Sequence, residues 1–286
     1  MSGETTRSVA LKSAAARLAA AGLEAPARDA RALLLAAASL RPVDLTLDPD
    51  APLDAASAVR LDGFIARRLA REPVTRIVGE RGFWTLDLLV APDVLDPRAD
   101  TETLIETALS LFGHRRAESL RILDLGSGSG ALLCALLAEF ENAFGVAVDL
   151  SPAACAASKA NLAHCGLAAR AAVLRGDWAR AIEARFDLVV SNPPYIPAAD
   201  IASLDPEVRL HDPALALDGG ADGLDCYRAI AREAPRLMRA KGAVILEAGA
   251  GQAADIAEFL AAAGLEIAMV RDDLGGHARA VAGRKP

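Results

Sequence analysis

Residues 121–130 read RILDLGSGSG, an apolar run that ends in an acid and passes directly into glycines. Residues 121–125 predict a buried β-strand and residues 129–140 a helix, with the glycines in the loop between them. Glycine tolerates positive φ angles and lets a ligand approach the backbone, while the start of the helix offers free N–H groups. This stretch therefore predicts the strand–loop–helix unit at which a parallel sheet binds a small molecule.

The sequence after residue 100 continues this alternation of strands and helices. A second helix begins at Ser151-Pro152, where serine suits the N-cap and proline the first turn. Further strands are predicted over 143–149, 172–174, 186–190, 243–247, 267–270 and 278–281, and a further helix over 253–263. The pattern predicts an α/β fold of the class I, Rossmann-like type: a seven-stranded, mostly parallel sheet with helices on both faces and ligands at the carboxyl ends of the strands.

Two further regions precede this part of the chain. Residues 1–78 contain Ala-, Leu- and Arg-rich segments at helical spacing, which predicts a small helical bundle. We expect this domain to dock the substrate, although a purely stabilising role fits the same pattern. Residues 79–100 contain two short apolar runs separated by Ala91-Pro92-Asp93, which predicts a β-hairpin connector. The catalytic domain is then expected over residues 101–286.

The composition excludes several classes of protein. Of the 286 residues, 53% are hydrophobic, but no apolar run reaches the ~18 residues that a membrane span needs. Neither a signal peptide nor a lipidation motif is visible, so we expect a cytoplasmic protein. The four cysteines and four histidines are scattered without metal-ligand spacing, which predicts neither a metal site nor disulfides. The net charge of −7 disfavours a nucleic-acid partner.

The glycine loop favours S-adenosylmethionine over a dinucleotide. Its spacing is G-x-G-x-G, whereas pyrophosphate-binding loops have G-x-G-x-x-G. Asp124 opens the loop, and an acid suits a ligand with cationic ammonium and sulfonium groups. We predict that Asp124 supports the amino-acid end of the cofactor. The loop residues predicted to contact the cofactor are Gly126, Ser127, Gly128, Ser129 and Gly130.

Two later loops complete the predicted cofactor site. Asp149 ends the next strand, about 20 residues after the glycine loop, where a carboxylate commonly accepts both ribose hydroxyls. A helix N-cap is the alternative role, but Ser151 is better placed for it. Asp177 and Trp178 follow the third strand, where adenine would lie. We predict that Asp177 accepts from the adenine amino group and that Trp178 packs on the ring, with simple packing as the alternative for Trp178.

The fourth strand runs into Ser191-Asn192-Pro193-Pro194-Tyr195, which predicts the methyl-transfer site. The nitrogen of a carboxamide or aromatic amine is a poor nucleophile because its lone pair is delocalised. Two fixed acceptors, the Asn192 side-chain oxygen and the Pro193 carbonyl, can hold both N–H groups so that the lone pair faces the methyl donor. Pro194 has no N–H to compete for that carbonyl, and Tyr195 can cover the planar group.

We therefore predict Asn192, Pro193 and Tyr195 as catalytic residues. The same residues and Pro194 are predicted to bind the substrate, and Asn192 also to contact the cofactor. A rigid turn without function is the alternative interpretation of this tetrapeptide.

These motifs resemble the HemK/PrmC family, the protein-(glutamine-N5) methyltransferases that modify class-1 peptide chain release factors. The likeness covers nearly the whole chain. It is carried by residues 82–84 (GFW), 97–102 (PRADTE), 122–130 (ILDLGSGSG), 176–178 (GDW), 190–196 (VSNPPYI), 207–209 (EVR), 212–217 (DPALAL), 219–224 (GGADGL) and 246–247 (LE).

The resemblance implies methylation of the glutamine in the GGQ motif of a release factor. It also implies that the helical region docks the release factor and that residues 207–224 form an insert beside the substrate pocket. The Asp, Pro and Gly content of that segment independently predicts a loop.

Further residues enter as candidates through the same resemblance. Phe83 is implied to line the glutamine pocket. Arg98, Asp100, Thr101 and Glu102 are secondary candidates, with capping of the next helix as their alternative role. The family usually has Ile-Pro-Arg-Pro in this loop, whereas residues 96–99 read DPRA, and this departure makes the local backbone less rigid.

Three other functions stay open at this point. A glutamine methyltransferase of a ribosomal protein would share the motifs and differ in its docking region. An adenine-N6 nucleic-acid methyltransferase uses the same tetrapeptide but needs a basic channel. A helical binding module with a degenerate transferase domain is opposed by the intact Asp149 and Asn192. We expect the protein to be a monomer.

Overall fold

The computed structural model describes residues 5–286. The chain divides into two compact units, one that extends to Gly79 and one over Glu80–Pro286. Each unit has its own hydrophobic core.

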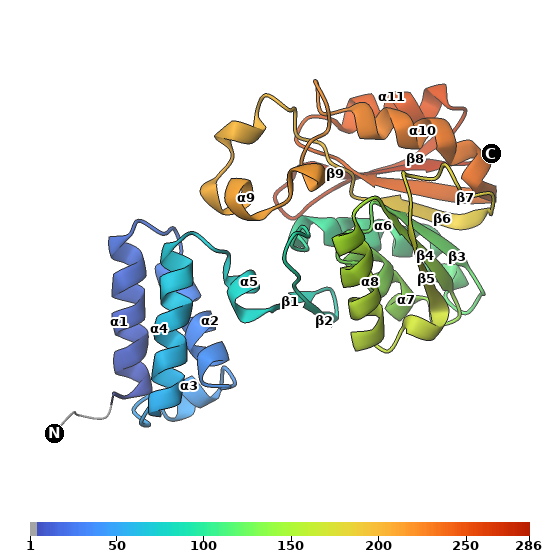
Figure 1. Ribbon diagram of the computed structural model, residues 1–286. Coiled ribbons are helices and arrows are strands. Elements are labelled where there is room, and N and C mark those ends of the chain that lie inside the picture. The colour runs from blue at the N-terminus through green and yellow to red at the C-terminus, as the bar shows by residue number, and fades with distance from the viewer. Residues whose placement is uncertain (1–4) are drawn as a thin grey trace. The chain divides into compact units, whose positions relative to one another are not determined.

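The first unit is a helical bundle. Its helices are α1 (Arg7–Ala20), α2 (Pro26–Ala37), α3 (Asp44–Leu47), α4 (Ala55–Leu69) and α5 (Val74–Val78) (Figure 1). Leu18, Leu33 and Ile65 from the three longest helices are almost completely buried together. Thr6 and Asp54 cap α1 and α4 through side-chain oxygens, and Pro26 starts α2, as expected for helix N-termini.

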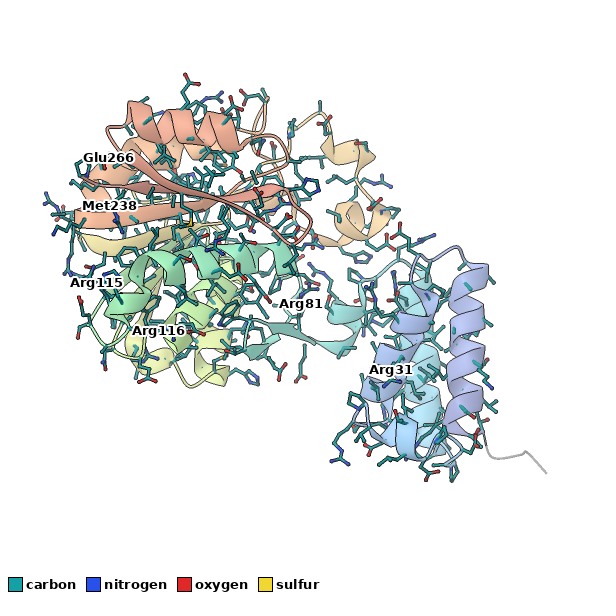
Figure 2. The ribbon with its side chains drawn as sticks, turned by 180° about the vertical axis from the view of Figure 1, so that it is seen from behind. Arg31, Arg81, Arg115, Arg116, Met238 and Glu266 are labelled. Atoms are coloured by element: carbon teal, nitrogen blue, oxygen red, sulfur yellow. The ribbon has the colours of Figure 1, made fainter. Side chains whose placement is uncertain are left out.

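The second unit contains a seven-stranded sheet with the order β5-β4-β3-β6-β7-β9-β8. Its strands are β3 (Arg121–Leu125), β4 (Phe144–Asp149), β5 (Ala171–Arg175), β6 (Phe186–Ser191), β7 (Met238–Glu247), β8 (Glu266–Asp272) and β9 (Ala278–Arg284). Every neighbouring pair is parallel except those that include β9, which runs antiparallel to both β7 and β8. Figure 2 shows Met238 and Glu266, the first residues of β7 and β8, at the same edge of the sheet.

Helices cover both faces of this sheet. On one face lie α6 (Glu102–Phe112), α7 (Ala131–Glu139) and α8 (Pro152–His164), and on the other lie α10 (Asp225–Leu237) and α11 (Ala253–Ala262) (Figure 1). Consecutive strand residues point to opposite faces. Ile122 accordingly packs in the first of the two core clusters and Leu123 in the second. The predicted α/β fold with a seven-stranded, mostly parallel sheet is confirmed.

The connector differs from the predicted hairpin in the position of its turn. The hairpin pairs β1 (Glu80–Phe83) with β2 (Leu86–Leu89), so its turn lies at Trp84 and Thr85 and not at residues 91–93. Trp84 has a φ of +56°, which is unfavourable for a side chain of this size. Two hydrogen bonds hold it there: its backbone N–H donates to Glu102 (2.8 Å) and its indole N–H to Glu139 (2.7 Å).

Two other segments were not predicted as helices. The segment expected to be a loop, residues 207–224, contains most of α9 (Pro206–His211), and α10 precedes β7. Pro206 stands at the first turn of α9, where proline has no N–H to lose. In the part of the chain that the structure describes, no helix is both long and apolar enough to cross a membrane.

Candidate active site

A first pocket, of about 240 Å³, opens at the carboxyl ends of β3, β4, β5 and β6. This is the position predicted for the ligand of a parallel sheet. Six of the predicted cofactor residues line it: Gly126, Gly128, Asp149, Asp177, Trp178 and Asn192. The structure therefore brings together residues from four separate loops.

The glycine loop, residues 124–130, has the backbone that its sequence predicts. Gly126, Gly128 and Gly130 have φ angles of +69°, +54° and +79°, a region that residues with a Cβ rarely adopt. The loop is fixed from behind by α8, because the Ser158 hydroxyl donates to the Gly128 carbonyl at 2.9 Å. A Cβ on Gly126 would lie 3.4 Å from the Trp178 ring, so glycine lets the tryptophan pack against the loop.

Asp149 holds the second side of the pocket. Its Oδ2 accepts from the Gly128 N–H and its Oδ1 from the Ser151 N–H, both at 2.8 Å. Ser151 itself is the N-cap of α8, accepting from Ala154, so Asp149 is not needed for that role. Each carboxylate oxygen has two acceptor sites, and Asp149 therefore keeps capacity for two ligand hydroxyls.

Asp124 is a buried carboxyl group beneath the glycine loop. Its side chain is 1% exposed, and neither of its oxygens has a hydrogen-bond partner among the described residues. Burial, with a further contribution from the charge of Asp149, raises the pKa of Asp124 to about 7, and the nearby Leu133 backbone N–H opposes this rise. A buried carboxylate without a partner is costly, and a cation brought close to it would offset that cost.

A second pocket lies on the other side of Asn192. Pro193, Tyr195 and Glu247 line it together with Asn192, and residues from the 204–217 segment cover it. Asn192 lines both pockets, so it stands at the boundary between them. Pro194 lines the first pocket. Burial raises the pKa of the Tyr195 hydroxyl, and the nearby Glu247 adds to this effect, so Tyr195 stays neutral.

Asn192 is held by a chain of two hydrogen bonds. Its Nδ2 donates to the Thr101 hydroxyl oxygen at 3.1 Å, and the Thr101 hydroxyl donates to Glu247 Oε2 at 2.6 Å. Glu247 is part of a motif that carries the family resemblance, but its contact with Asn192 through Thr101 was not predicted. Its place at the end of a predicted strand was the available signal, because ligands gather at those ends.

Four predicted cofactor residues do not line the first pocket. Asp124, Ser127 and Ser129 are buried, and the Ser127 hydroxyl pairs with Ser158 at 3.1 Å, which supports the loop from within. Gly130 is the left-handed N-cap residue of α7, and a Cβ there would lie 3.1 Å from Ser158. The side chains of Ser127 and Ser129 therefore shape the loop, and contact of Ser127, Ser129 and Gly130 with the ligand stays a prediction.

Phe83 is also placed differently from the prediction. Its side chain is 1% exposed in the core cluster of the sheet's α6–α8 face, and neither pocket is lined by it. It therefore packs the hairpin onto the domain, and its contact with the glutamine stays a prediction.

The secondary candidates connect elements and do not cap α6. Arg98 pairs with Asp212 at 2.7 Å, which ties this loop to the covering segment. Glu102 accepts from the Trp84 N–H, and Asp100 lies 3.5 Å from the Arg279 guanidinium. Neither Asp100 nor Thr101 caps α6 through its side chain.

Over residues 5–286, no group of His, Cys, Asp and Glu side chains has the geometry of a metal site. The four cysteines are free thiols.

Comparison with known proteins identifies the family. The domain family described as PrmC N-terminal domain matches residues 9–79, and the Methyltransferase small domain matches residues 100–204. A curated release factor glutamine methyltransferase from Cereibacter sphaeroides is 48% identical, over 97% of this chain and 98% of its own length. The chain belongs to the release factor glutamine methyltransferase family. Another member, from Rhodospirillum rubrum, is 47% identical over 94% of this chain and 82% of its own length.

The fold of this release factor glutamine methyltransferase family member also occurs in more distant enzymes. A 16S rRNA methyltransferase of T. thermophilus, solved in complex with AdoMet and guanosine, aligns with a TM-score of 0.51. The alignment covers 72% of this chain and 50% of that one at 19% identity, which supports the shared fold alone. As a family member, the chain is an S-adenosylmethionine-dependent methyltransferase.

Proposed function

We propose that this protein transfers the methyl group of S-adenosylmethionine to the side-chain amide nitrogen of a glutamine in a class-1 peptide chain release factor, within its GGQ motif. The observation that carries the proposal is the position of Asn192. It stands between a pocket built from the glycine loop and Asp149 and a pocket built from Pro193 and Tyr195. A group in one pocket can therefore reach a group in the other beside this side chain.

The first pocket fits S-adenosylmethionine, which supplies an electrophilic methyl group. Its sulfonium and ammonium groups are cationic, and the unpartnered Asp124 carboxylate lies under the loop that would hold them. Asp149 can accept the ribose hydroxyls with its free acceptor sites. Asp177 and Trp178 line the end of the pocket where we place the adenine.

The second pocket fits a primary carboxamide. Because Asn192 Nδ2 is engaged by Thr101, the Oδ1 atom is left to accept one amide N–H. The Pro193 carbonyl accepts the other, and Pro194 has no N–H that could compete for it. Tyr195 covers the planar group. Two acceptors fixed in advance favour the amide geometry in which the nitrogen lone pair faces the methyl group, and this raises kcat.

The proton leaves after methyl transfer and needs no dedicated base. A methylated amide nitrogen carries a positive charge and is acidic enough to lose a proton to solvent or to a neighbouring acceptor. The neutral Tyr195 keeps its hydroxyl hydrogen and is not required as that acceptor.

A release factor as substrate also suggests roles for other parts of the protein. We propose that the helical unit docks the release factor, that the covering segment around α9 borders the glutamine, and that the protein acts in the cytoplasm as a monomer. The net charge of −7 speaks against nucleic acid as substrate.

Mass spectrometry tests the proposal directly. The protein is incubated with methyl-labelled S-adenosylmethionine and either an intact release factor or a ribosomal protein as competitor substrate. We expect one methyl group on the GGQ glutamine and methylation slowed roughly 10² to 10³-fold by the Asn192→Ala substitution. Methylation of the ribosomal protein alone, or of an adenine in added RNA or DNA, would overturn the substrate assignment.

A further inference from the structure

The amide of Asn192 can be an acceptor for the substrate only in one of its two orientations. Rotation by 180° about the last side-chain bond exchanges Oδ1 and Nδ2 with almost no change in shape. The wrong orientation would present an NH2 group to the NH2 group of a glutamine. The surroundings of Asn192 must therefore decide between two nearly isosteric states.

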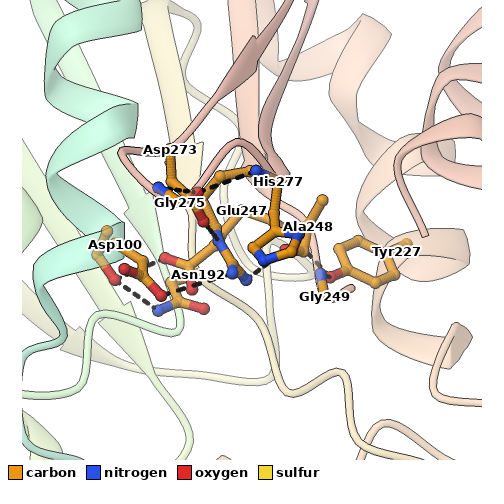
Figure 3. Close-up of polar contacts among 11 residues, drawn as sticks. Asp100, Asn192, Tyr227, Glu247, Ala248, Gly249, Asp273, Gly275 and His277 are labelled. Carbon is orange, nitrogen blue, oxygen red and sulfur yellow. Dashed lines mark hydrogen bonds and ion pairs between the residues drawn. The ribbon is translucent and has the colours of Figure 1, made fainter. Parts of the chain in front are cut away.

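Thr101 and Glu247 determine which orientation the Asn192 amide adopts. The Thr101 hydroxyl has a single hydrogen, and it donates this hydrogen to Glu247 Oε2 at 2.6 Å. Figure 3 shows Asn192 and Glu247 within this group of polar contacts. An ionised carboxylate can only accept, so the direction of this hydrogen bond is fixed. The Thr101 oxygen can then interact with Asn192 only as an acceptor, and it accepts from Nδ2 at 3.1 Å.

We propose that Thr101 and Glu247 are positioning residues that hold Asn192 with its oxygen toward the substrate. The inference rests on the proposed function, in which Asn192 Oδ1 accepts from the glutamine amide. Thr101 and Glu247 act through Asn192 and need no contact with the substrate.

Both residues are rigidly held. Thr101 is 4% exposed at the end of a 3₁₀ turn (Ala99–Thr101), and Glu247 is 1% exposed at the end of β7. Glu247 pairs with Ala280 of β9, and its backbone carbonyl accepts from the Tyr227 hydroxyl at 2.9 Å. A fixed donor–acceptor chain of this kind is the support that a preorganised acceptor needs.

The charge of Glu247 makes this orientation dependent on pH. Burial raises the pKa of Glu247 to about 7, opposed by the Thr101 hydrogen bond and by Arg279. The titratable and charged groups around it are Arg98, Asp100, Tyr195, Tyr227, Asp273 and Arg279. Above this pKa, the carboxylate compels Thr101 to donate. Below it, the protonated carboxyl can donate to Thr101 instead, and the preference for one Asn192 orientation is lost.

Four variants test the proposal on a release factor substrate. Thr101→Val keeps the side-chain shape and removes the acceptor for Asn192 Nδ2. Glu247→Gln removes the fixed direction of the hydrogen bond between Thr101 and residue 247. We expect both to lower kcat about tenfold, which is less than the loss of the Asn192 acceptor itself because Asn192 can still adopt the productive orientation, with KM for S-adenosylmethionine nearly unchanged. Thr101→Ser keeps the hydroxyl and should restore most of kcat.

Thr107→Val is the matched control. Thr107 is fully buried on α6 and donates to the Thr103 carbonyl at 2.7 Å, away from Asn192. We expect it to leave kcat unchanged. The wild-type kcat should rise with pH through about 7, and the Glu247→Gln profile should lack that step.

The outcomes separate positioning from direct catalysis by Glu247. A slow Glu247→Gln with a normal Thr101→Val would mean that Glu247 acts on the substrate itself, and the positioning role would be wrong. Normal kcat in both variants would also overturn it. Neutron diffraction of the wild-type protein decides the same question without any substrate or variant, so it holds even if release factors are not methylated. We expect the hydroxyl deuterium of Thr101 to point toward Glu247 and the deuterated amide nitrogen, Nδ2, of Asn192 to face Thr101. The reverse arrangement refutes the proposal.

Discussion

Replacement of Asp124 by asparagine should stabilise the protein in the absence of S-adenosylmethionine, and more so at pH 8 than at pH 5. The pKa of Asp124 is raised from 3.8 to about 7, mainly by burial. Below pH 3.8 the carboxyl is protonated in both the folded and unfolded states and costs nothing. As pH rises, the unfolded state ionises first, so stability falls until the folded state ionises near pH 7.

The magnitude follows from this interval. Each pH unit between the two pKa values costs ~1.4 kcal/mol. The cost in the wild type is therefore about 1.5 kcal/mol at pH 5 and up to about 4 kcal/mol at pH 8. Asparagine does not ionise, so the free energy of unfolding of Asp124→Asn relative to wild type should increase by about 2.5 kcal/mol between these pH values.

Urea denaturation of both proteins at pH 5 and pH 8 measures this difference. Any fixed cost of burying an asparagine amide cancels between the two pH values. Asp187→Asn is the matched control, because Asp187 is a buried carboxylate that accepts from Arg115, Arg239 and the Arg121 N–H. We expect that variant to be less stable than wild type. A pH-independent difference for Asp124→Asn would refute the assignment of Asp124 as an unpaired buried charge.

The remaining predictions concern binding and turnover. Asp149→Ala should weaken S-adenosylmethionine binding about 10- to 100-fold, since a charged acceptor contributes roughly 1.5 to 3 kcal/mol per hydrogen bond, and unchanged affinity in calorimetry would exclude the ribose contact. Asn192→Ala should lower kcat by roughly 10² to 10³ while leaving cofactor affinity intact. Asn192→Asp should also be slow, because it lacks the NH2 group that donates to Thr101. Near-normal kcat in both variants would mean that residues 192–195 form only a rigid turn. Deletion of residues 1–78 should preserve cofactor binding and raise KM for an intact release factor, whereas an equal kcat/KM would leave the helical unit with a stabilising role.

The sequence was sufficient to predict residues whose position depends on local pattern and strand ends. The glycine loop, Asp149 and Asn192 each follow a recognisable strand, and parallel strands bring their carboxyl ends to one edge. The structure accordingly places Asp149 and Asn192 on one pocket. Side-chain direction within the loop was not predictable, and the structure buries the side chains of Ser127 and Ser129 behind it.

Features that depend on distant contacts were missed for a physical reason. The hairpin turn at Trp84 is stabilised by Glu102 and Glu139, which lie 18 and 55 residues away. Thr101 and Glu247 are 146 residues apart, and no local pattern relates them. Phe83 was assigned to the pocket by family resemblance, and the way the hairpin packs on the core determined its actual environment.

From the position of β9 between β7 and β8 we expect an order for folding. Strand β8 joins the sheet through β9, although β8 comes first in the chain. The two strands are joined by a short turn in which the Asp273 N–H donates to the His277 carbonyl, so they can form a hairpin locally before they meet β7. When that hairpin docks on β7, it brings Arg279 and Ala280, the β9 partner of Glu247, to the active site together. The active site therefore reaches its final electrostatic environment only when this hairpin has docked, and a mutation that slows hairpin formation would delay activity more than it delays formation of the glycine loop.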